Sequence, residues 1–404
     1  MSYCYDFFCY ACGTACAAGD NFFCPGCGDP LSVRAQATPA PGLFRDSPRD
    51  LWHYQDLLPI ASWEHVVTLG EGATPLLAAP RLSAHSGCRV DLKNEAANPT
   101  GAFKDRQISV GISHAREIGK STVAVVSSGN VACATAAYAA RAGMRAVLFM
   151  HAHAAPEKIR QCAVYGAKVI CVNSPAPSKV FELCLEACAK FGWYHLSTAG
   201  MYEPFNVEGA KTIAYELYQQ YDGDLPEWIV APVGGGGLLG AIWRGFLDLQ
   251  RLGLIEKPPR LAGAQAEGCA LLKQCIAEGW SFQEHLKHPW PDPETIAGGI
   301  ADDILFDGHT VLPAIRETDG AAIAVSENAI RQAILRLAST EGMFVEPSCA
   351  VTVAALEQLP GVRPETGVCC VLTGSGFKDP GAVRGLLPEP ARVGLNLGEV
   401  EAAL

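Results

Sequence analysis

Short apolar runs of strand length alternate with helix-like stretches along most of the chain. Runs rich in apolar and β-branched residues predict strands at 90–95, 122–126, 146–150, 168–172, 228–233, 261–268 and 368–372. The stretches between them predict helices at 107–119, 131–142, around 157–162, from 238, and at 326–341. Alternation of short strands with helices predicts βαβ units. The pattern therefore indicates an α/β fold with parallel sheets.

One predicted strand ends in four consecutive glycines. The strand at 228–233 is followed by Gly234, Gly235, Gly236 and Gly237, and a helix is expected from Leu238. Glycines let the backbone approach a bound anion closely, and a helix start directs its amides toward that anion. The Lys-Ser/Thr pair of nucleoside-triphosphate loops is missing, so we favour a phosphate monoester as the ligand.

The same glycines leave one alternative open. Gly235, Gly237 and Gly240 satisfy the G-x-G-x-x-G pattern of dinucleotide sites after a strand. The acidic residue expected about twenty positions later is poorly matched. On this motif alone, an NAD(P)-binding enzyme stays a rival prediction.

A second polar turn follows the strand at 122–126. Ser127, Ser128, Gly129 and Asn130 lead into an alanine-rich helix. A strand, a glycine-containing turn and a helix start together form an anion site from backbone amides and the helix dipole. An ordinary helix cap is the alternative reading of this turn.

The sequence Asn-Pro-Thr-Gly-Ala-Phe-Lys-Asp-Arg at 98–106 places Lys104 between turn-forming residues and a predicted helix. A lysine that attacks a carbonyl carbon must be held in place and kept partly unprotonated. This setting therefore makes Lys104 a candidate nucleophile, whereas a solvated residue at a helix start is the simpler interpretation.

Four cysteines near the N-terminus occur in two Cys-x-x-Cys pairs, each followed by glycine. Cys9 and Cys12 form the first pair, and Cys24 and Cys27 the second. This spacing predicts a tetrahedral zinc site with four protein ligands, which has no open position and is therefore structural. Scattered reduced thiols are the alternative. A stretch rich in proline and alanine at 35–48 then predicts a linker.

Composition limits the classes of protein to consider. A chain of 404 residues that is 49% hydrophobic can fold into two or three packed domains. The net charge of −11, without a basic run, argues against nucleic acid as a partner. No apolar run approaches the length of a membrane span, and no secretory signal is visible. We therefore expect a cytoplasmic protein with no membrane partner.

Taken in order, NPTGAFKDR, SSGN, GGGG and TGSGFKD resemble the tryptophan-synthase-β-like (fold type II) pyridoxal-phosphate enzymes, and most closely the threonine synthases. The resemblance spans roughly 69–380, and the cysteine segment is similar to the ribbon of archaeal threonine synthases. It implies two doubly wound domains with the cofactor between them, behind a zinc ribbon. We expect the ribbon at 1–34, a large domain at 35–106 and 206–404, and a small domain at 107–205.

The resemblance also implies roles for individual residues. Lys104 would bond to pyridoxal phosphate and move the substrate's α-proton, and the turn at Ser127, Ser128, Gly129 and Asn130 would hold the α-carboxylate. Residues implied to contact the cofactor are Phe103, Lys104, Asn130, Gly234, Gly235, Gly236, Gly237, Leu238 and Thr373. Of these, Asn130 would face the phenolic oxygen and Thr373 the ring nitrogen.

The chain departs from the threonine synthase pattern at one segment. Where that family has N-P-x-R-x-E-G-Q-K-T, this chain has Asn206 in place of arginine and Ala210 in place of glutamine. Asn206 and Lys211 are nevertheless expected to contact the substrate. Arginine binds phosphate with two parallel hydrogen bonds, and asparagine cannot replace its charge.

Two activities on a small amino acid remain. The first is that of a threonine synthase, which releases phosphate from O-phosphohomoserine and adds water to give threonine. The second is β-elimination (an ammonia-lyase or dehydratase) or β-replacement on another amino acid, such as O-phosphoserine, serine, threonine or diaminopropionate. An inactive regulatory relative is a minor alternative, and the resemblance implies a homodimer.

Overall fold

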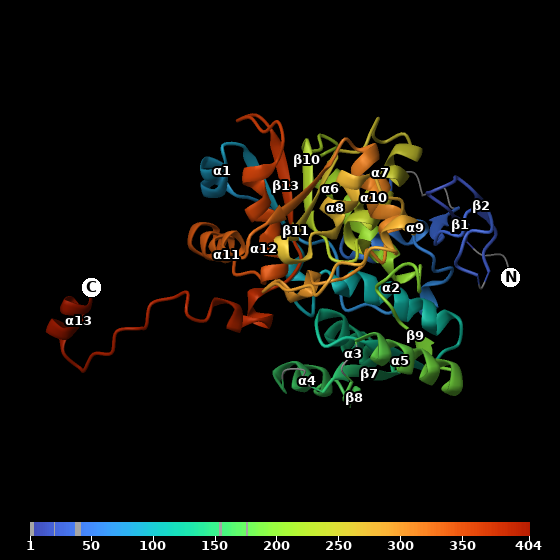
Figure 1. The fold of residues 1–404 in the computed structure, drawn as a ribbon, viewed down its shortest axis with the longest axis horizontal. Coiled ribbons are helices and arrows are strands. Elements are labelled where there is room, and N and C mark those ends of the chain that lie inside the picture. Colours follow the sequence, from blue (N-terminus) through green and yellow to red (C-terminus); the bar gives the residue numbers. More distant parts are fainter. Residues whose placement is uncertain (1–3, 20, 37–41, 153–155, 175–176) are drawn as a thin grey trace.

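A computed structural model describes residues 4–19, 21–36, 42–152, 156–174 and 177–404. Its strands form three separate sheets (Figure 1). Part of the linker expected at 35–48 lies outside the described residues. Within the described residues, no helix is both long enough and apolar enough to cross a membrane.

The N-terminal segment forms a small antiparallel sheet. Its strand order is β2 (Ala15–Cys16), β1 (Tyr5–Phe8) and β3 (Ser32–Ala35). Aromatic side chains attach this sheet to the rest of the chain. Tyr5 packs edge-on against Phe205 at 5.3 Å between ring centroids, and Tyr10 lies 5.1 Å from Trp243.

The largest sheet has six strands and is parallel except at one edge. Its order is β12 (Ala321–Val325), β11 (Arg260–Ala266), β10 (Trp228–Pro232), β13 (Gly367–Leu372), β5 (Arg89–Asn94) and β4 (Leu76–Ala78), with β4 antiparallel. Because side chains alternate along each strand, successive residues enter two different cores.

Helices cover both faces of this sheet. One core packs α1 (Pro80–Ser86), α11 (Glu327–Glu341) and α12 (Pro347–Ala354). The other packs α6 (Thr212–Gln220), α7 (Gly237–Arg251), α8 (Leu271–Glu278) and α10 (Gly308–Glu317), and α9 (Phe282–His285) adjoins α10. The arrangement is that of a doubly wound α/β domain.

The third sheet has four parallel strands, in the order β8 (Lys168–Val172), β7 (Arg145–His151), β6 (Thr122–Val126) and β9 (Tyr194–His195). One face packs against α2 (Lys104–Glu117), α3 (Asn130–Ala142) and α4 (Pro156–Ala163), and the other against α5 (Pro177–Phe191). The predicted α/β fold with two parallel sheets behind a cysteine-rich segment is confirmed.

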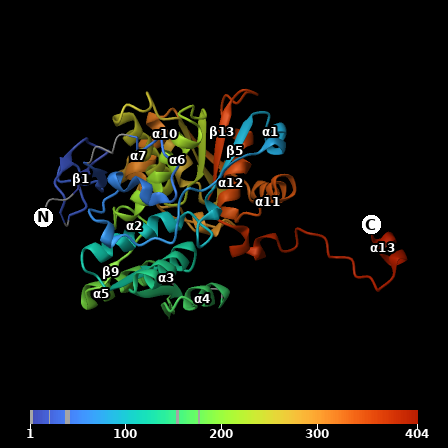
Figure 2. The same cartoon turned by 180° about the vertical axis from the view of Figure 1, so that it is seen from behind.

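Short 3₁₀ segments join these elements: η1 (Leu51–Leu57), η2 (Trp63–His65), η3 (Glu95–Ala97), η4 (Asn206–Lys211), η5 (Glu267–Cys269), η6 (Gly298–Ile300), η7 (Ala355–Gln358), η8 (Gly376–Lys378) and η9 (Pro380–Val383). After η9 the chain runs away from the body and ends in α13 (Leu397–Ala403), as Figures 1 and 2 both show.

Candidate active site

Two loops from distant parts of the chain hold Lys104. The Phe103 amide donates to the Thr373 carbonyl oxygen at 2.9 Å, and the Ser375 amide donates to the Gly101 carbonyl oxygen at 2.9 Å. Gly101 has φ +82°, a conformation that glycine adopts at little cost. Because β5 and β13 are neighbours, the loops that follow them meet, and Lys104 and Thr373 line the same cavity.

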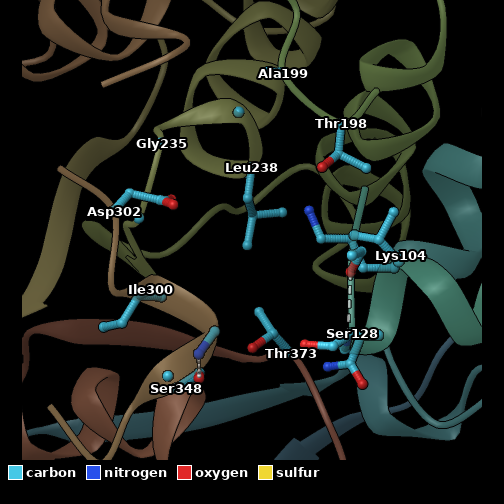
Figure 3. A pocket seen from close by; sticks show the side chains of 18 of the residues that line it. Lys104, Ser128, Thr198, Ala199, Gly235, Leu238, Ile300, Asp302, Ser348 and Thr373 are labelled. Atoms are coloured by element: carbon cyan, nitrogen blue, oxygen red, sulfur yellow. Dashed lines mark hydrogen bonds between the residues drawn. The ribbon is translucent and has the colours of Figure 1, made fainter. Parts of the chain in front are cut away.

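Lys104 is the first residue of α2, and its amine points into the cavity (Figure 3). Its Nζ donates to Gln107 Oε1 at 3.0 Å and lies 4.6 Å above the Phe103 ring. Burial lowers the pKa of Lys104 to about 8, although Asp302, Asp307 and Glu346 oppose the shift. A substantial fraction of the amine is therefore neutral near pH 8, as a nucleophile requires.

The turn after β6 places its polar groups at the start of α3. Ser127 Oγ accepts from the Gly129 amide at 3.1 Å, and α3 begins at Asn130. The Asn130 side chain donates to both carboxyl oxygens of Glu346, at 2.9 and 3.1 Å. Glu346 thereby fixes the orientation of the Asn130 amide.

The glycine loop joins β10 to α7 and leaves little room for side chains. Gly236 has φ +97°, and a Cβ there would lie 2.7 Å from Val311. A Cβ at Gly235 would lie 2.9 Å from Phe306. Glycines are therefore required here, and the start of α7 stays open to the cavity.

These segments enclose one cavity of about 560 Å³ between the two parallel sheets. It brings together the residues proposed above as cofactor and carboxylate contacts: Phe103, Lys104, Ser127, Ser128, Gly129, Asn130, Gly234, Gly235, Gly236, Gly237, Leu238 and Thr373. Figure 3 shows Leu238 between Lys104 on one wall and Asp302 on the other.

Asn206 and Lys211 do not line this cavity. Both are fully buried in η4, where the Asn206 side chain donates to the Ser197 carbonyl and Lys211 Nζ lies 2.8 Å from both Glu208 and Asp248. Their side chains are committed to packing, because η4 lies against α2 and α7. The expected substrate contacts are therefore corrected, and both residues are left out of the proposed site.

Sequence reasoning missed several charged residues of the cavity. Asp302 and Asp307 come from the irregular segment after η6, and Glu346 precedes α12. Lys158 and Lys378 also line the cavity, and among its described lining residues none is an arginine. The Gly-Ile-Ala-Asp-Asp run carries no periodic pattern, so local sequence offered no signal for its position.

The four cysteine sulfurs of the N-terminal segment lie within 4.8 Å of one another. The Cys9 and Cys27 sulfurs are 3.4 Å apart, and those of Cys12 and Cys24 are 3.6 Å apart. A tetrahedral zinc site with Zn–S bonds of about 2.3 Å requires sulfurs roughly 3.8 Å apart. The geometry therefore suits zinc.

Residues 67–374 match the family model described as pyridoxal-phosphate dependent enzyme. The threonine synthase of Methanocaldococcus jannaschii is 34% identical over 364 residues, which are 88% of this chain and 87% of that protein. The threonine synthase of Mycobacterium bovis is 36% identical over 333 residues, which are 81% of this chain and 88% of that protein.

Solved structures share the same fold. A threonine deaminase from the organism abbreviated T.th. has a TM-score of 0.63 at 28% identity, and the match covers 75% of this chain and 92% of that one. Maize serine racemase has a TM-score of 0.66 at 22% identity, covering 78% and 91%.

The cavity also suits the cofactor of this family. An amine of lowered pKa at Lys104 matches an aldehyde, the glycine loop at the start of α7 matches a phosphate, and the Thr373 hydroxyl matches a ring nitrogen. Fold, cavity and sequence similarity agree, and the chain belongs to the fold type II family of pyridoxal-phosphate-dependent enzymes.

Proposed function

We propose that this pyridoxal-phosphate-dependent lyase acts on a small α-amino acid with a leaving group on its side chain. The first candidate reaction is that of the threonine synthases to which it is similar: O-phosphohomoserine and water give threonine and phosphate. The observation that carries the proposal is the Lys104 amine, held at the start of α2 inside the cavity with its pKa lowered to about 8.

Each proposed role follows from a group that the cavity exposes. The bound cofactor withdraws electrons from the substrate's α-carbon. Lys104 Nζ takes the α-proton and later returns a proton, because its pKa lies close to neutral pH. Backbone amides of the turn at 127–130, with the dipole of α3, bind the α-carboxylate.

The glycine loop and Thr373 are proposed to hold the cofactor from two sides. Amides at the start of α7 suit its phosphate, and the neutral Thr373 hydroxyl suits its ring nitrogen. A neutral hydroxyl leaves that nitrogen less protonated than a carboxylate would, which favours elimination and replacement over transamination. Phe103 and Leu238 are proposed as apolar contacts of the ring.

A second candidate is elimination from an amino acid without a phosphate group, to give ammonia and a keto acid. The charges of the cavity favour it, because none of its described lining residues is an arginine and Asp302, Asp307, Glu346 and Asp379 all line it. Repulsion from four carboxyl groups opposes a second phosphate unless Lys158 and Lys378 compensate.

The first experiment incubates the purified enzyme with O-phosphohomoserine and measures threonine and phosphate. Equal amounts of both products, absent with Lys104→Ala, would establish the threonine synthase reaction. A yellow enzyme that forms neither product would exclude it and direct the assay to O-phosphoserine, serine, threonine and diaminopropionate. A preparation that stays colourless after added pyridoxal phosphate would contradict the whole proposal.

We also propose that Cys9, Cys12, Cys24 and Cys27 bind one structural zinc ion, since their sulfurs already lie at suitable separations. The domain limits at 1–34, 35–106 with 206–404, and 107–205 stay predictions. So do the homodimer and the cytoplasmic location.

A further inference from the structure

Two carboxyl groups lie against the glycine loop on the cavity wall. Asp302 Oδ2 is 2.5 Å from the position of a Cβ at Gly234, and Asp307 Oδ2 is 2.9 Å from that of a Cβ at Gly237. Both residues line the cavity. In Figure 3 the Asp302 carboxyl group lies beside Gly235 and points inward, across the cavity from Lys104.

The Asp307 carboxyl group has one free oxygen. Its Oδ1 accepts from the Gly200 amide at 2.9 Å, whereas its Oδ2 has no hydrogen-bond partner among the described residues. Only 3% of Asp307 is exposed. A buried carboxylate oxygen without a partner costs free energy, so a ligand that supplies a donor is favoured at this position.

The cations near this pair are already engaged. Arg244 of α7 forms an ion pair with Glu208, and Lys104 is the proposed attachment point of the cofactor. Asp303 adds negative charge beside Asp302, and the pKa of His309 is lowered to about 3 by burial, so that ring is neutral. Lys158 and Lys378 act instead on Glu346.

A cofactor phosphate at the glycine loop would add further negative charge next to both carboxyl groups. Burial raises the pKa of Asp302 to about 6 and that of Asp307 to about 7. Both carboxyl groups can therefore ionise at pH 8, and a positive group placed between them and the phosphate would stabilise all three.

We propose that Asp302 and Asp307 form a subsite for a positively charged nitrogen on the substrate's side chain. The substrate class is then α-amino acids with a second amino group on the β- or γ-carbon. This inference rests on the proposed lyase function, and within it favours the second candidate over a phosphorylated substrate.

The simplest probe of this class is 2,3-diaminopropionate. Its elimination breaks the α-C–H bond and the β-C–N bond, and the β-nitrogen leaves as ammonia with the bonding electron pair. Hydrolysis of the remaining enamine by one water gives pyruvate and a second ammonia, and no oxidant or reductant is needed.

The test compares 2,3-diaminopropionate with serine, whose leaving group is an uncharged hydroxyl, using the cofactor-loaded enzyme at pH 8. Wild type is expected to show at least a tenfold higher kcat/KM for the diamino acid. Asp302→Asn and Asp307→Asn should each reduce that preference at least tenfold, mainly through KM. Asp303→Asn is the matched control, because Asp303 is exposed and lies outside the cavity, and should keep the preference.

Binding to the wild type provides a second measurement that needs no variant. The diamino acid should change the cofactor's absorbance at a concentration at least tenfold lower than alanine does. Equal affinity for the two, or equal losses on both substrates in Asp302→Asn and Asp307→Asn, would overturn the subsite.

Conversion of O-phosphohomoserine to threonine without preferential binding of the diamino acid would also overturn the subsite, while the lyase function would stand. Failure to turn over any amino acid would remove the lyase proposal, and the binding comparison would still decide the subsite.

Discussion

At the level of single residues, Lys104 differs from a surface lysine in its burial and in its partners. Its amine contacts Gln107 and the Phe103 ring, and no carboxylate forms an ion pair with it among the described residues. Burial therefore dominates its protonation, and the neutral form is accessible near physiological pH.

The lowered pKa predicts how fast the apoenzyme takes up pyridoxal phosphate. Only the neutral amine attacks an aldehyde, so the rate should rise about tenfold per pH unit below pH 8 and level off above it. Stopped-flow absorbance would measure this rate. Borohydride should then fix the cofactor to Lys104, and Lys104→Ala should lose both reactions; a rate that is flat from pH 6 to 9 would contradict the assignment.

Gly236 predicts a residue-level effect on cofactor binding. Alanine at φ +97° is strained by about 1–2 kcal/mol, and its Cβ would also meet Val311 at 2.7 Å. Gly236→Ala should therefore weaken pyridoxal-phosphate binding at least tenfold in a fluorescence titration. Gly253→Ala is the control, because Gly253 has φ +70° with nothing within 4 Å of its Cβ; equal effects of the two would argue against a role of the loop in binding.

At the level of elements, a buried ionic network fixes helix α2 behind Lys104. Arg106 pairs with Glu95 at 2.7 Å and with Glu216 at 2.5 Å, and Lys93 pairs with Glu216 at 2.6 Å. All four side chains are fully buried. The network links α2 to β5, η3 and α6, so the start of α2 has a fixed position in the large sheet.

Removing Arg106 should be strongly destabilising, because it leaves two buried carboxylates short of a partner. Arg106→Ala is expected to lower the free energy of unfolding by about 3–5 kcal/mol. Arg116→Ala, an exposed change on the same helix, should cost less than about 0.5 kcal/mol. Urea denaturation monitored by circular dichroism would measure both, and similar values for the two variants would contradict this role.

The same network predicts a dependence of stability on acid. Burial alone raises the pKa of Glu216, but Arg106 and Lys93 outweigh it and hold the pKa at about 2. Its stabilising contribution is present above the unfolded pKa of about 4.3 and is lost as the pH falls toward 2. Wild type should therefore lose stability between about pH 4 and pH 2, and Arg106→Ala should lose less over that interval.

Local pattern was enough to predict the elements whose signals are local. β6 occupies 122–126 as expected, and helix 326–341 was found within one residue because Ser326 caps it. β12 was missed because Ala-Ala-Ile-Ala-Val is not distinctive, and β9 because it has only two residues. Asp302 and Asp307 reach the cavity through tertiary packing, and Asn206 leaves it for the same reason, which no local pattern reports.

At the level of the whole molecule, the N-terminal segment contacts two regions that lead to the cavity. Tyr10, between Cys9 and Cys12, packs on Trp243 of α7, and Tyr5 and Phe7 pack on Phe205 ahead of η4. Because α7 starts at the glycine loop, the segment braces the element that carries it.

Loss of the proposed zinc should therefore loosen this segment. Cys9→Ser is expected to lose one zinc per chain by elemental analysis and to lower the melting temperature, because four thiols without metal cannot hold the turns. Cys16→Ser, outside the cluster, should keep the metal. Zinc-free wild type of unchanged melting temperature would contradict a structural role.

The position of β13 between β5 and β10 has a consequence for synthesis of the protein. Residues 367–372 leave the ribosome last among the strands of that sheet, yet they lie at its centre and lead to the turn that holds the Lys104 loop. A growing chain thus has β5 and β10 without the strand that joins them, and exposes unpaired edges until synthesis is nearly complete. We expect chaperone binding to such nascent chains, and cofactor uptake only after release.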